Sequence, residues 1–368
     1  MALPSVRVSS STSDYEKELE IAQLAVQRAS IVTNQVFAEK TKDTISKTDA
    51  SPVTVGDFAA QALIIHALKK NFPEDSIVGE EEASVLRGNS QLRDLIWNLV
   101  KNASLSDPTV EASLGGPIKS VEEMLDAIDQ GTSPGGNKGR IWALDPIDGT
   151  KGFLRGGQYA ICLALMVDGE VKVGVLGCPN LPTDDTTPIT IESGFNQTND
   201  EGKGILIAAV SGGGAISRAL GNGALKPCKP IHMRPVEDIT KAIFCESVEK
   251  SHSSHGHQEL IAKELGLTGA SIRMDSQAKY ASLARGTSDI YLRLSVRADY
   301  QEKIWDHASG EVIVREAGGE VTDTFGRRLD FGKGRTLAGN KGIVAASKEV
   351  HGKVLAAVKK VLGESKSS

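Results

Sequence analysis

The sequence contains few aromatic residues, few cysteines and no long apolar run. Phenylalanine, tryptophan and tyrosine make up 4% of the 368 residues, so few rings are available to stack on a planar ligand. The four cysteines lie far apart, without a Cys-x-x-Cys pair. Because Cys162 and Cys245 fall in apolar runs, we expect buried free thiols rather than disulfides. No apolar run approaches the roughly 20 residues that a membrane-spanning helix needs.

Neither sign of charge dominates the chain. A net charge of −5 at pH 7 argues against a protein that binds nucleic acid regardless of sequence, because such proteins usually present a basic face. It leaves room for a small anionic substrate held by a few local cations. Residues 1–18 lack the apolar core of a signal peptide and the arginine-rich composition of a transit peptide, so we expect a cytoplasmic protein. No apolar stripe calls for a dimer, and we expect a monomer.

The pattern of apolar residues predicts a mixed α/β fold. Two β-rich runs joined by Asp168 and Gly169 predict a hairpin. A helix is expected from Phe58 to about Asn71, followed by a short strand in "SIVGEEE". From residue 239 onward, strand-like and helix-like segments alternate, which favours an α/β second lobe. Residues 101–139 are poorly patterned apart from a helix expected to begin at Ser120, and we interpret them as an insertion.

The segment "WALDPIDGTKGF", residues 142–153, carries the strongest chemical signal. An apolar run leads into Asp145 and Asp148, and charges at the end of a buried strand are costly unless something pairs with them. Proline and glycine stiffen the turn, so both carboxylates and the carbonyl of Ile147 can point into one small volume. These oxygen ligands suit a hard cation such as magnesium. The alternative is an aspartate-rich turn on the surface.

Three further acids lie at the ends of predicted elements, and each has an ordinary explanation. Glu80 belongs to an acidic run after a strand, where a solvated patch is common. Asp57 and Asp306 stand where helix N-caps belong. Together with Asp145 and Asp148, however, they place five acids at element ends, where open α/β folds build their sites.

The blocks "GEE", "WALDPIDGTKGF" and "WDHASGEVIVREAGG" resemble those of the lithium-sensitive, magnesium-dependent phosphatase superfamily. This superfamily includes inositol monophosphatases, inositol polyphosphate 1-phosphatases and fructose-1,6-bisphosphatases. The blocks occur in the expected order, and the similarity runs from about residue 14 to residue 350. The segments "SPVTVGDFAAQALI", "SVEKSHSSH", "DSQAKYASLARG", "DIYLRL" and "YQEKIWDHASG" are similar to the 3'(2'),5'-bisphosphate nucleotidases of the fungal and plant type.

The resemblance implies a layered α-β-α-β-α fold, classed as α/β or α+β, with two lobes and the active site between them. We expect residues 14–238 to form the lobe with the metal site and residues 239–363 to form the lobe with the nucleotide-binding residues. The implied cofactor is magnesium, two or three ions, because a phosphate dianion beside carboxylates is repelled unless divalent cations outweigh the acids.

The resemblance also implies a role for individual residues. Asp57 and Thr150 match the pair that orients and deprotonates the attacking water, and Thr150 also matches a substrate contact. The other implied substrate contacts are His252, with His255 as the second choice, and Ser276, Lys279, Arg293 and Asp306. The implied metal ligands are Glu80, Asp145, Ile147 through its carbonyl, Asp148 and Asp306. Without the resemblance, Lys279 and Arg293 would be interpreted as surface charges.

The activity implied is the removal of the 3'-phosphate from adenosine 3',5'-bisphosphate, with AMP and phosphate as products. The 2',5' isomer and 3'-phosphoadenosine 5'-phosphosulfate are the further implied substrates, with a place in sulfate assimilation and inhibition by lithium and sodium. The alternatives are an inositol polyphosphate 1-phosphatase and a non-catalytic sensor that binds nucleotide or metal. A water-activating pair speaks against the sensor, because binding alone does not require one.

Overall fold

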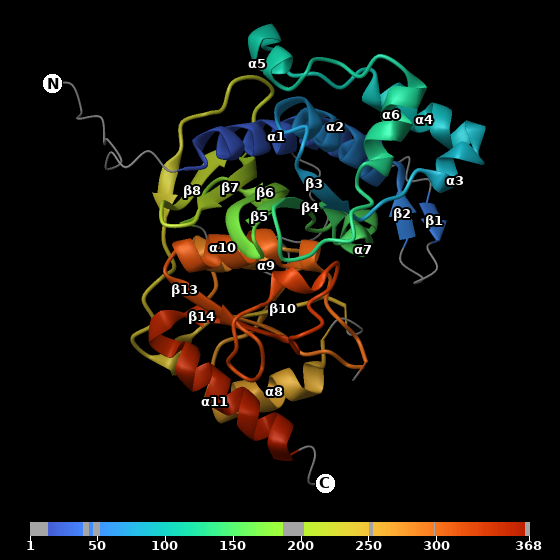
Figure 1. The fold of residues 1–368 in the computed structure, drawn as a ribbon. Helices are drawn as coiled ribbons and strands as arrows, with labels where there is room; N and C mark the ends of the chain where they lie inside the picture. Colours follow the sequence, from blue (N-terminus) through green and yellow to red (C-terminus); the bar gives the residue numbers. More distant parts are fainter. Residues whose placement is uncertain are drawn as a thin grey trace, which may run out of the picture.

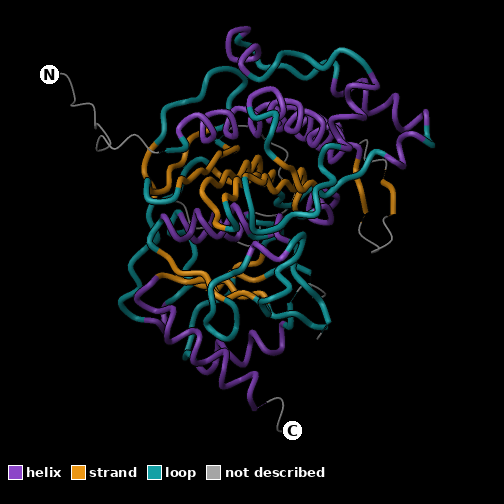
Figure 2. The backbone as a smooth tube through the Cα atoms, viewed as in Figure 1, coloured by secondary structure: helices purple, strands orange, loops and turns teal. Residues whose placement is uncertain are grey.

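Five alternating layers of helix and sheet make up the computed structural model, which describes residues 14–39, 44–46, 52–186, 202–249, 253–297 and 299–364. The helices α1 and α2 cover one face of a seven-stranded sheet, and α9 and α10 cover the other (Figure 1). The same α9 and α10 pack on a five-stranded sheet, whose far face is covered by α8 and α11 (Figure 2). The predicted layered α/β architecture is therefore confirmed.

The seven-stranded sheet has its strands in the order β3-β4-β5-β6-β7-β8-β9. Only β3 and β4 run parallel, and the other neighbours are antiparallel. The predicted hairpin joins β5 and β6, where Asp168 and Gly169 both have positive φ angles of 51° and 82°, as a two-residue hairpin turn requires. The strands are β3 (Ser76–Gly79), β4 (Arg140–Asp148), β5 (Ala160–Val167), β6 (Glu170–Pro182), β7 (Lys203–Val210), β8 (Gly214–Ala219) and β9 (Lys229–Ile231).

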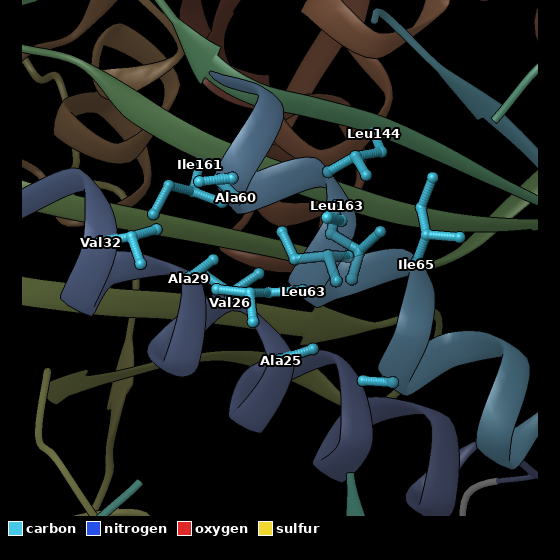
Figure 3. Packing of buried hydrophobic residues seen from close by; sticks show 14 of the residues in the cluster. Ala25, Val26, Ala29, Val32, Ala60, Leu63, Ile65, Leu144, Ile161 and Leu163 are labelled. Atoms are coloured by element: carbon cyan, nitrogen blue, oxygen red, sulfur yellow. The ribbon is translucent and has the colours of Figure 1, made fainter. Parts of the chain in front are cut away.

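The outer helices α1 (Glu16–Glu39) and α2 (Val55–Asn71) pack on this sheet through a dry apolar layer. Figure 3 shows small side chains of α1, including Ala25 and Ala29, in one apolar cluster with Leu63 of α2 and Ile161 and Leu163 of β5. All of these residues are almost completely buried. Because small residues on α1 let the two helices approach each other closely, α2 is held firmly above β4. This matters for function, because α2 carries Asp57 and β4 carries the acidic turn.

The middle layer consists of α9 (Ala278–Ala284) and α10 (Ala308–Glu316). A Cβ atom at Gly174 of β6 would lie 2.4 Å from a methyl group of Val312 and 2.7 Å from the carbonyl oxygen of Ser309. Only glycine therefore allows α10 to lie this close to the sheet. The layer belongs to the C-terminal part of the chain but completes the core of the N-terminal part.

The five-stranded sheet has the order β11-β10-β12-β14-β13. Its strands are β10 (Phe244–Glu246), β11 (Ile272–Arg273), β12 (Ile290–Arg293), β13 (Gly319–Thr322) and β14 (Ile343–Ser347), and the helices on its far face are α8 (His255–Glu264) and α11 (Lys348–Glu364). Strand β10 runs parallel to β11 and β12, whereas β14 is antiparallel to both of its neighbours. The division of the chain into lobes 14–238 and 239–363 falls between the strands of the two sheets and stays a prediction.

Residues 101–139, expected to be an insertion, contribute to the core. The Arg28 side chain of α1 is fully buried, and its Nη1 donates to Glu111 Oε1 on α5 at 2.8 Å. Leu114 and Ile118 are also buried. Ser120 caps α6 as expected, since its hydroxyl accepts the backbone N–H of Glu123. The helices of this region and of the residues just before it are α3 (Ser84–Arg87), α4 (Ser90–Val100), α5 (Pro108–Ser113) and α6 (Val121–Asp129).

The remaining elements are short. They are the antiparallel pair β1 (Thr44–Ser46) and β2 (Pro52–Thr54), helix α7 (Thr150–Arg155), and the 3-10 turns η2 (Ile239–Lys241), η3 (Ile304–Asp306) and η4 (Phe331–Lys333). The four cysteines are free, and three of them are buried, as expected from their apolar surroundings. In the part of the chain that the structure describes, no helix combines the length and apolar composition of a membrane span.

Candidate active site

A cavity of about 1000 Å³ opens where the ends of β3 and β4 meet segments of the C-terminal part of the chain. Most of the predicted site residues line it, although they come from positions more than 200 residues apart. The predicted residues in its wall are Glu80, Asp145, Ile147, Asp148, Thr150, Ser276, Lys279, Arg293 and Asp306.

The acidic turn is part of the cavity wall and not a surface turn. Asp145 is 3% exposed and belongs to β4, and the pairing of β4 with β5 shifts register between Asp145 and Asp148. Gly149 then adopts a φ of 88°, which a side chain would strain. A Cβ atom at Gly149 would also lie 2.9 Å from the Cβ atom of Ser276. The turn is therefore both bent by its glycine and packed directly against the C-terminal lobe.

Parallel pairing brings Glu80 to the same edge of the sheet. Gly79, the last residue of β3, lies opposite Leu144 of β4, so Glu80 leaves β3 beside Asp145 of β4. The proximity has an electrostatic effect, because the charge of Glu80 contributes to raising the pKa of Asp145. Glu80 is partly exposed and lies in the cavity wall, so it is not simply part of a solvated acidic patch.

Asp306 completes the acidic cluster from the opposite lobe. Carboxylate oxygens of Asp145, Asp148 and Asp306 lie within 4.8 Å of one another. The expectation of Asp306 as a helix cap is wrong, because it ends the 3-10 turn η3, and His307 occupies the N-cap position of α10. The 3-10 turn η3, which precedes α10 in the chain, places the Asp306 carboxylate at the cavity.

Asp57 is likewise no N-cap. Helix α2 begins at Val55, three residues earlier than a cap at Asp57 requires, so Asp57 lies inside the first turn. Its side chain is 1% exposed, and its charge helps to raise the pKa of Asp145. Asp57 therefore lies near the acidic cluster, although it does not line the cavity itself.

Three carboxylates of the cluster have raised pKa values. Burial and the like charges around them raise the pKa of Asp145 and of Asp306 well above the usual range. Burial raises the pKa of Asp148 to about 6, although the nearby Lys279 opposes the shift. Asp145 Oδ1 is buried and has no hydrogen-bond partner among the described residues. A buried cluster of this kind fits a hard divalent cation, which takes oxygen ligands and offsets their charge.

The two predicted phosphate-binding cations lie inside the protein, so their interpretation as surface charges is wrong. Lys279 is 3% exposed, and its Nζ donates to the carbonyl oxygen of Ser276 at 2.8 Å. Burial lowers the pKa of Lys279. The Arg293 side chain is 11% exposed, with its Nε 2.7 Å from Glu302 and its Nη2 3.8 Å from Asp306. Both cations face the cavity from the lobe opposite the acidic turn.

The predicted histidine contact does not have a described position. His252 lies outside the described residues, and its role stays a prediction. His255, the second choice, begins α8, and its Nε2 lies 3.1 Å from the carbonyl oxygen of Ser247. It is not part of the cavity wall.

Sequence reasoning missed three residues that organise the site. Glu302 holds Arg293, and burial would raise its pKa, but Arg293 and His307 outweigh burial and lower it to about 2. Arg335 donates to the carbonyl oxygens of Gly79 and Ser133, and its guanidinium stacks over the ring of Trp305.

The third residue is Gln277, whose backbone N–H donates to Asp148 Oδ2 at 2.5 Å. Glu302 and Gln277 both stand in segments already quoted for their resemblance, "YQEKIWDHASG" and "DSQAKYASLARG". The resemblance of these segments was the one sequence signal for Glu302 and Gln277. Arg335 stands in none of the quoted segments.

Comparisons with known proteins agree with this geometry. A model of the inositol monophosphatase family matches residues 14–362. A 3'(2'),5'-bisphosphate nucleotidase of Emericella nidulans is 61% identical, covering 95% of this chain and 99% of the relative. One of Schizosaccharomyces pombe is 51% identical, covering 94% and 95%. The structure of an IMPase from Thermotoga maritima has the same fold, with a TM-score of 0.60 at 20% identity over 95% of this chain and 99% of that chain. The resemblance inferred from the sequence blocks is thus confirmed.

Proposed function

Because this chain belongs to the inositol monophosphatase family, and its relatives of high identity are named 3'(2'),5'-bisphosphate nucleotidases, we propose that it removes the 3'-phosphate of adenosine 3',5'-bisphosphate. The products are AMP and phosphate. The observation that supports this most directly is the cavity, whose wall combines an acidic cluster with two cations that are largely buried, Lys279 and Arg293. In this proposal, one phosphate reacts at the acidic cluster and the two cations hold the second phosphate.

The acidic cluster is the proposed metal site. Asp145, Asp148 and Asp306 would hold magnesium, together with Glu80 and the carbonyl oxygen of Ile147. When bound, magnesium supplies Lewis-acid stabilisation to the attacking and leaving oxygens of an in-line displacement. The number of ions, two or three, is part of the proposal. The orphaned Oδ1 of Asp145 supports the assignment, because a buried carboxylate oxygen without a donor needs a cation or a proton.

Asp57 and Thr150 are the proposed water-activating pair. Thr150 starts α7, and its hydroxyl donates to the carbonyl oxygen of Ile147 at 3.2 Å. With its hydrogen engaged in this way, Thr150 Oγ1 presents its lone pairs to a water molecule. Asp57 would then accept the proton of that water at its carboxylate, as a general base.

Substrate recognition is assigned to Ser276, Lys279, Arg293 and the undescribed His252, with Thr150 and Asp306 contacting the reacting end. The uncleaved 5'-phosphate would receive charge-assisted hydrogen bonds from Lys279 and Arg293. Glu302 supports this role, because it fixes the guanidinium of Arg293 at the wall of the cavity. Arginine suits this position, since its planar fork can bind two phosphate oxygens at once.

The proposal also covers further substrates, a metabolic role and inhibition. We include the 2',5' isomer and 3'-phosphoadenosine 5'-phosphosulfate among the substrates, a role in sulfate assimilation, and inhibition by lithium and sodium. We also propose that the protein acts as a monomer in the cytoplasm.

Phosphate release separates this function from its rivals. The purified protein should release phosphate from adenosine 3',5'-bisphosphate in the presence of magnesium and lose this activity when magnesium is removed. Faster release from inositol 1,4-bisphosphate would instead indicate an inositol polyphosphate 1-phosphatase. Binding of the nucleotide without release from either substrate would indicate a sensor.

A further inference from the structure

Gln277 connects three separate segments around the acidic cluster. Its backbone N–H donates to Asp148 Oδ2. Its side-chain Nε2 donates to the carbonyl oxygen of Trp305 at 2.7 Å. Its side-chain Oε1 accepts the backbone N–H of Gly310 at 2.9 Å and the hydroxyl of Ser309 at 3.2 Å. One residue therefore joins the acidic turn of the first lobe to both the turn η3 and the first turn of α10.

The location of Gln277 makes these bonds significant. It is 2% exposed, and a buried amide is costly unless its donors and acceptor are engaged. The neighbouring Ser276 has a φ of 66°, a backbone conformation that side chains rarely adopt. This conformation lies against the acidic turn, where a Cβ atom on Gly149 would come within 2.9 Å of the Cβ atom of Ser276. A strained backbone and a buried amide with three side-chain hydrogen bonds thus meet at the contact between the lobes.

The bonds of Gln277 end beside two of the acids of the cluster. One leads to Asp148 directly, and another holds the carbonyl of Trp305, the residue before Asp306. These two carboxylates come from different lobes and repel each other, so their charges alone would separate them. A rigid link between them opposes that separation.

We propose that Gln277 is a positioning residue that fixes the separation of Asp148 and Asp306, so that carboxylates from both lobes can hold the same divalent cation. The inference rests on the proposed metal site and extends it to a residue of the cavity wall whose side-chain amide bonds to Trp305, Ser309 and Gly310. Groups that orient metal ligands typically change metal affinity or activity by about 10- to 100-fold when they are removed.

The test replaces Gln277 and a matched buried glutamine. Gln277→Met keeps the volume and the backbone N–H but removes the side-chain hydrogen bonds to Trp305, Ser309 and Gly310. Gln277→Asn keeps an amide that is too short to span them. Gln258→Met is the control, because Gln258 is fully buried in the same lobe, donates to Ser253 and Leu292, and lies outside the cavity wall.

Magnesium alone is the first probe, with the full-length protein and no substrate. The rise in Tm on titration with magnesium should reach half its maximum at about tenfold higher concentration in Gln277→Met than in wild type. The half-maximal magnesium concentration should also rise in Gln277→Asn, and in Gln258→Met it should equal the wild-type value. In steady-state assays, the Gln277 variants should lose kcat while KM for adenosine 3',5'-bisphosphate changes less than about twofold.

A purely structural role gives a different result. Gln277→Met would then lower Tm by about as much as Gln258→Met does and leave the magnesium titration unchanged, which overturns the inference. If Gln277→Met does not fold, a wild-type magnesium titration in Gln277→Asn overturns it equally. A wild-type protein whose Tm ignores magnesium would refute the metal site itself, and with it the proposed function.

Discussion

Replacing Arg293 by lysine should separate recognition of the uncleaved phosphate from recognition of the phosphate that reacts. Lysine keeps a positive charge beside the buried Glu302, so the carboxylate keeps a partner. It loses the planar fork that binds two oxygens at once. A charge-assisted hydrogen bond contributes about 1.5 to 3 kcal/mol. Losing one should therefore lower kcat/KM for adenosine 3',5'-bisphosphate by roughly 10- to 150-fold.

The comparison substrate is 3'-AMP, which has the reacting phosphate but no 5'-phosphate. Its kcat/KM should change by less than about threefold in Arg293→Lys, because the lost bond was never made to it. Arg297→Lys is a suitable control, since Arg297 lines the same cavity but is paired with Asp299 at the exposed rim. For Arg297→Lys, kcat/KM for both substrates should equal the wild-type value.

Equal losses on both substrates would refute the assignment of Arg293 to the 5'-phosphate. They would mean that Arg293 supports the lobe instead. Arg293→Ala is a less clean variant, because it leaves the buried Glu302 with His307 but without its arginine, and breaking a buried ion pair costs about 3 to 5 kcal/mol of stability. A clear drop in Tm for Arg293→Ala, but not for Arg293→Lys, would confirm that the two effects are separate.

The remaining predictions concern the acids. Asp145→Asn should reduce activity below about a tenth of wild type, a barrier increase of at least roughly 1.4 kcal/mol, and weaken the magnesium-dependent rise in Tm. Asp57→Asn should lower kcat far more than it raises KM, because its proposed role is on the water and not on the substrate; a Tm loss with normal kinetics would contradict this. The folded-state pKa of Glu302, about 2, lies below its ordinary value of 4.5, so its stabilising effect is present above pH 4.5 and is lost as the pH falls toward 2. The difference in Tm between wild type and Glu302→Gln, measured without divalent cations, should therefore shrink between pH 5 and pH 3, and a constant difference would count against the ion pair.

Local patterns predicted local structure well. The Asp168-Gly169 pair predicted the β5–β6 hairpin because few residues other than these tolerate the positive φ angles of the turn. Ser120 predicted the start of α6 because its hydroxyl satisfies a backbone N–H that the helix leaves open. The metal-binding interpretation of the Asp145–Asp148 turn followed from the same kind of reasoning, since the stiffness of the turn is encoded within a few adjacent residues.

Helix boundaries were harder to predict, because they depend on neighbours outside the helix. The cap interpretation of Asp57 failed because β2 ends at Thr54 and α2 begins at the next residue. The cap interpretation of Asp306 failed because a 3-10 turn precedes α10 and takes up the residues expected to lead into the helix. Asp306 belongs instead to the acidic cluster, and Asp57 lies near enough to raise the pKa of Asp145.

The residues that the sequence did not reveal act through contacts between distant segments. Arg335 donates to the carbonyl oxygen of Gly79, which is 256 residues away. Glu302 becomes significant only once Arg293 is known to lie beside it. Neither residue is part of a periodic pattern or a turn motif, so composition and spacing carry no information about their partners.

The middle layer of helices has a consequence for how the chain is made. The face of the seven-stranded sheet that contains Leu176 and Ile207 is buried against Val312 of α10, yet all seven strands precede α10 in the chain. While the protein is being synthesised, this apolar face stays exposed to water until about residue 316 has left the ribosome. The first lobe therefore cannot complete its folding before most of the second has been made. A nascent chain of this protein spends the intervening time with a sheet surface available to chaperones and to aggregation.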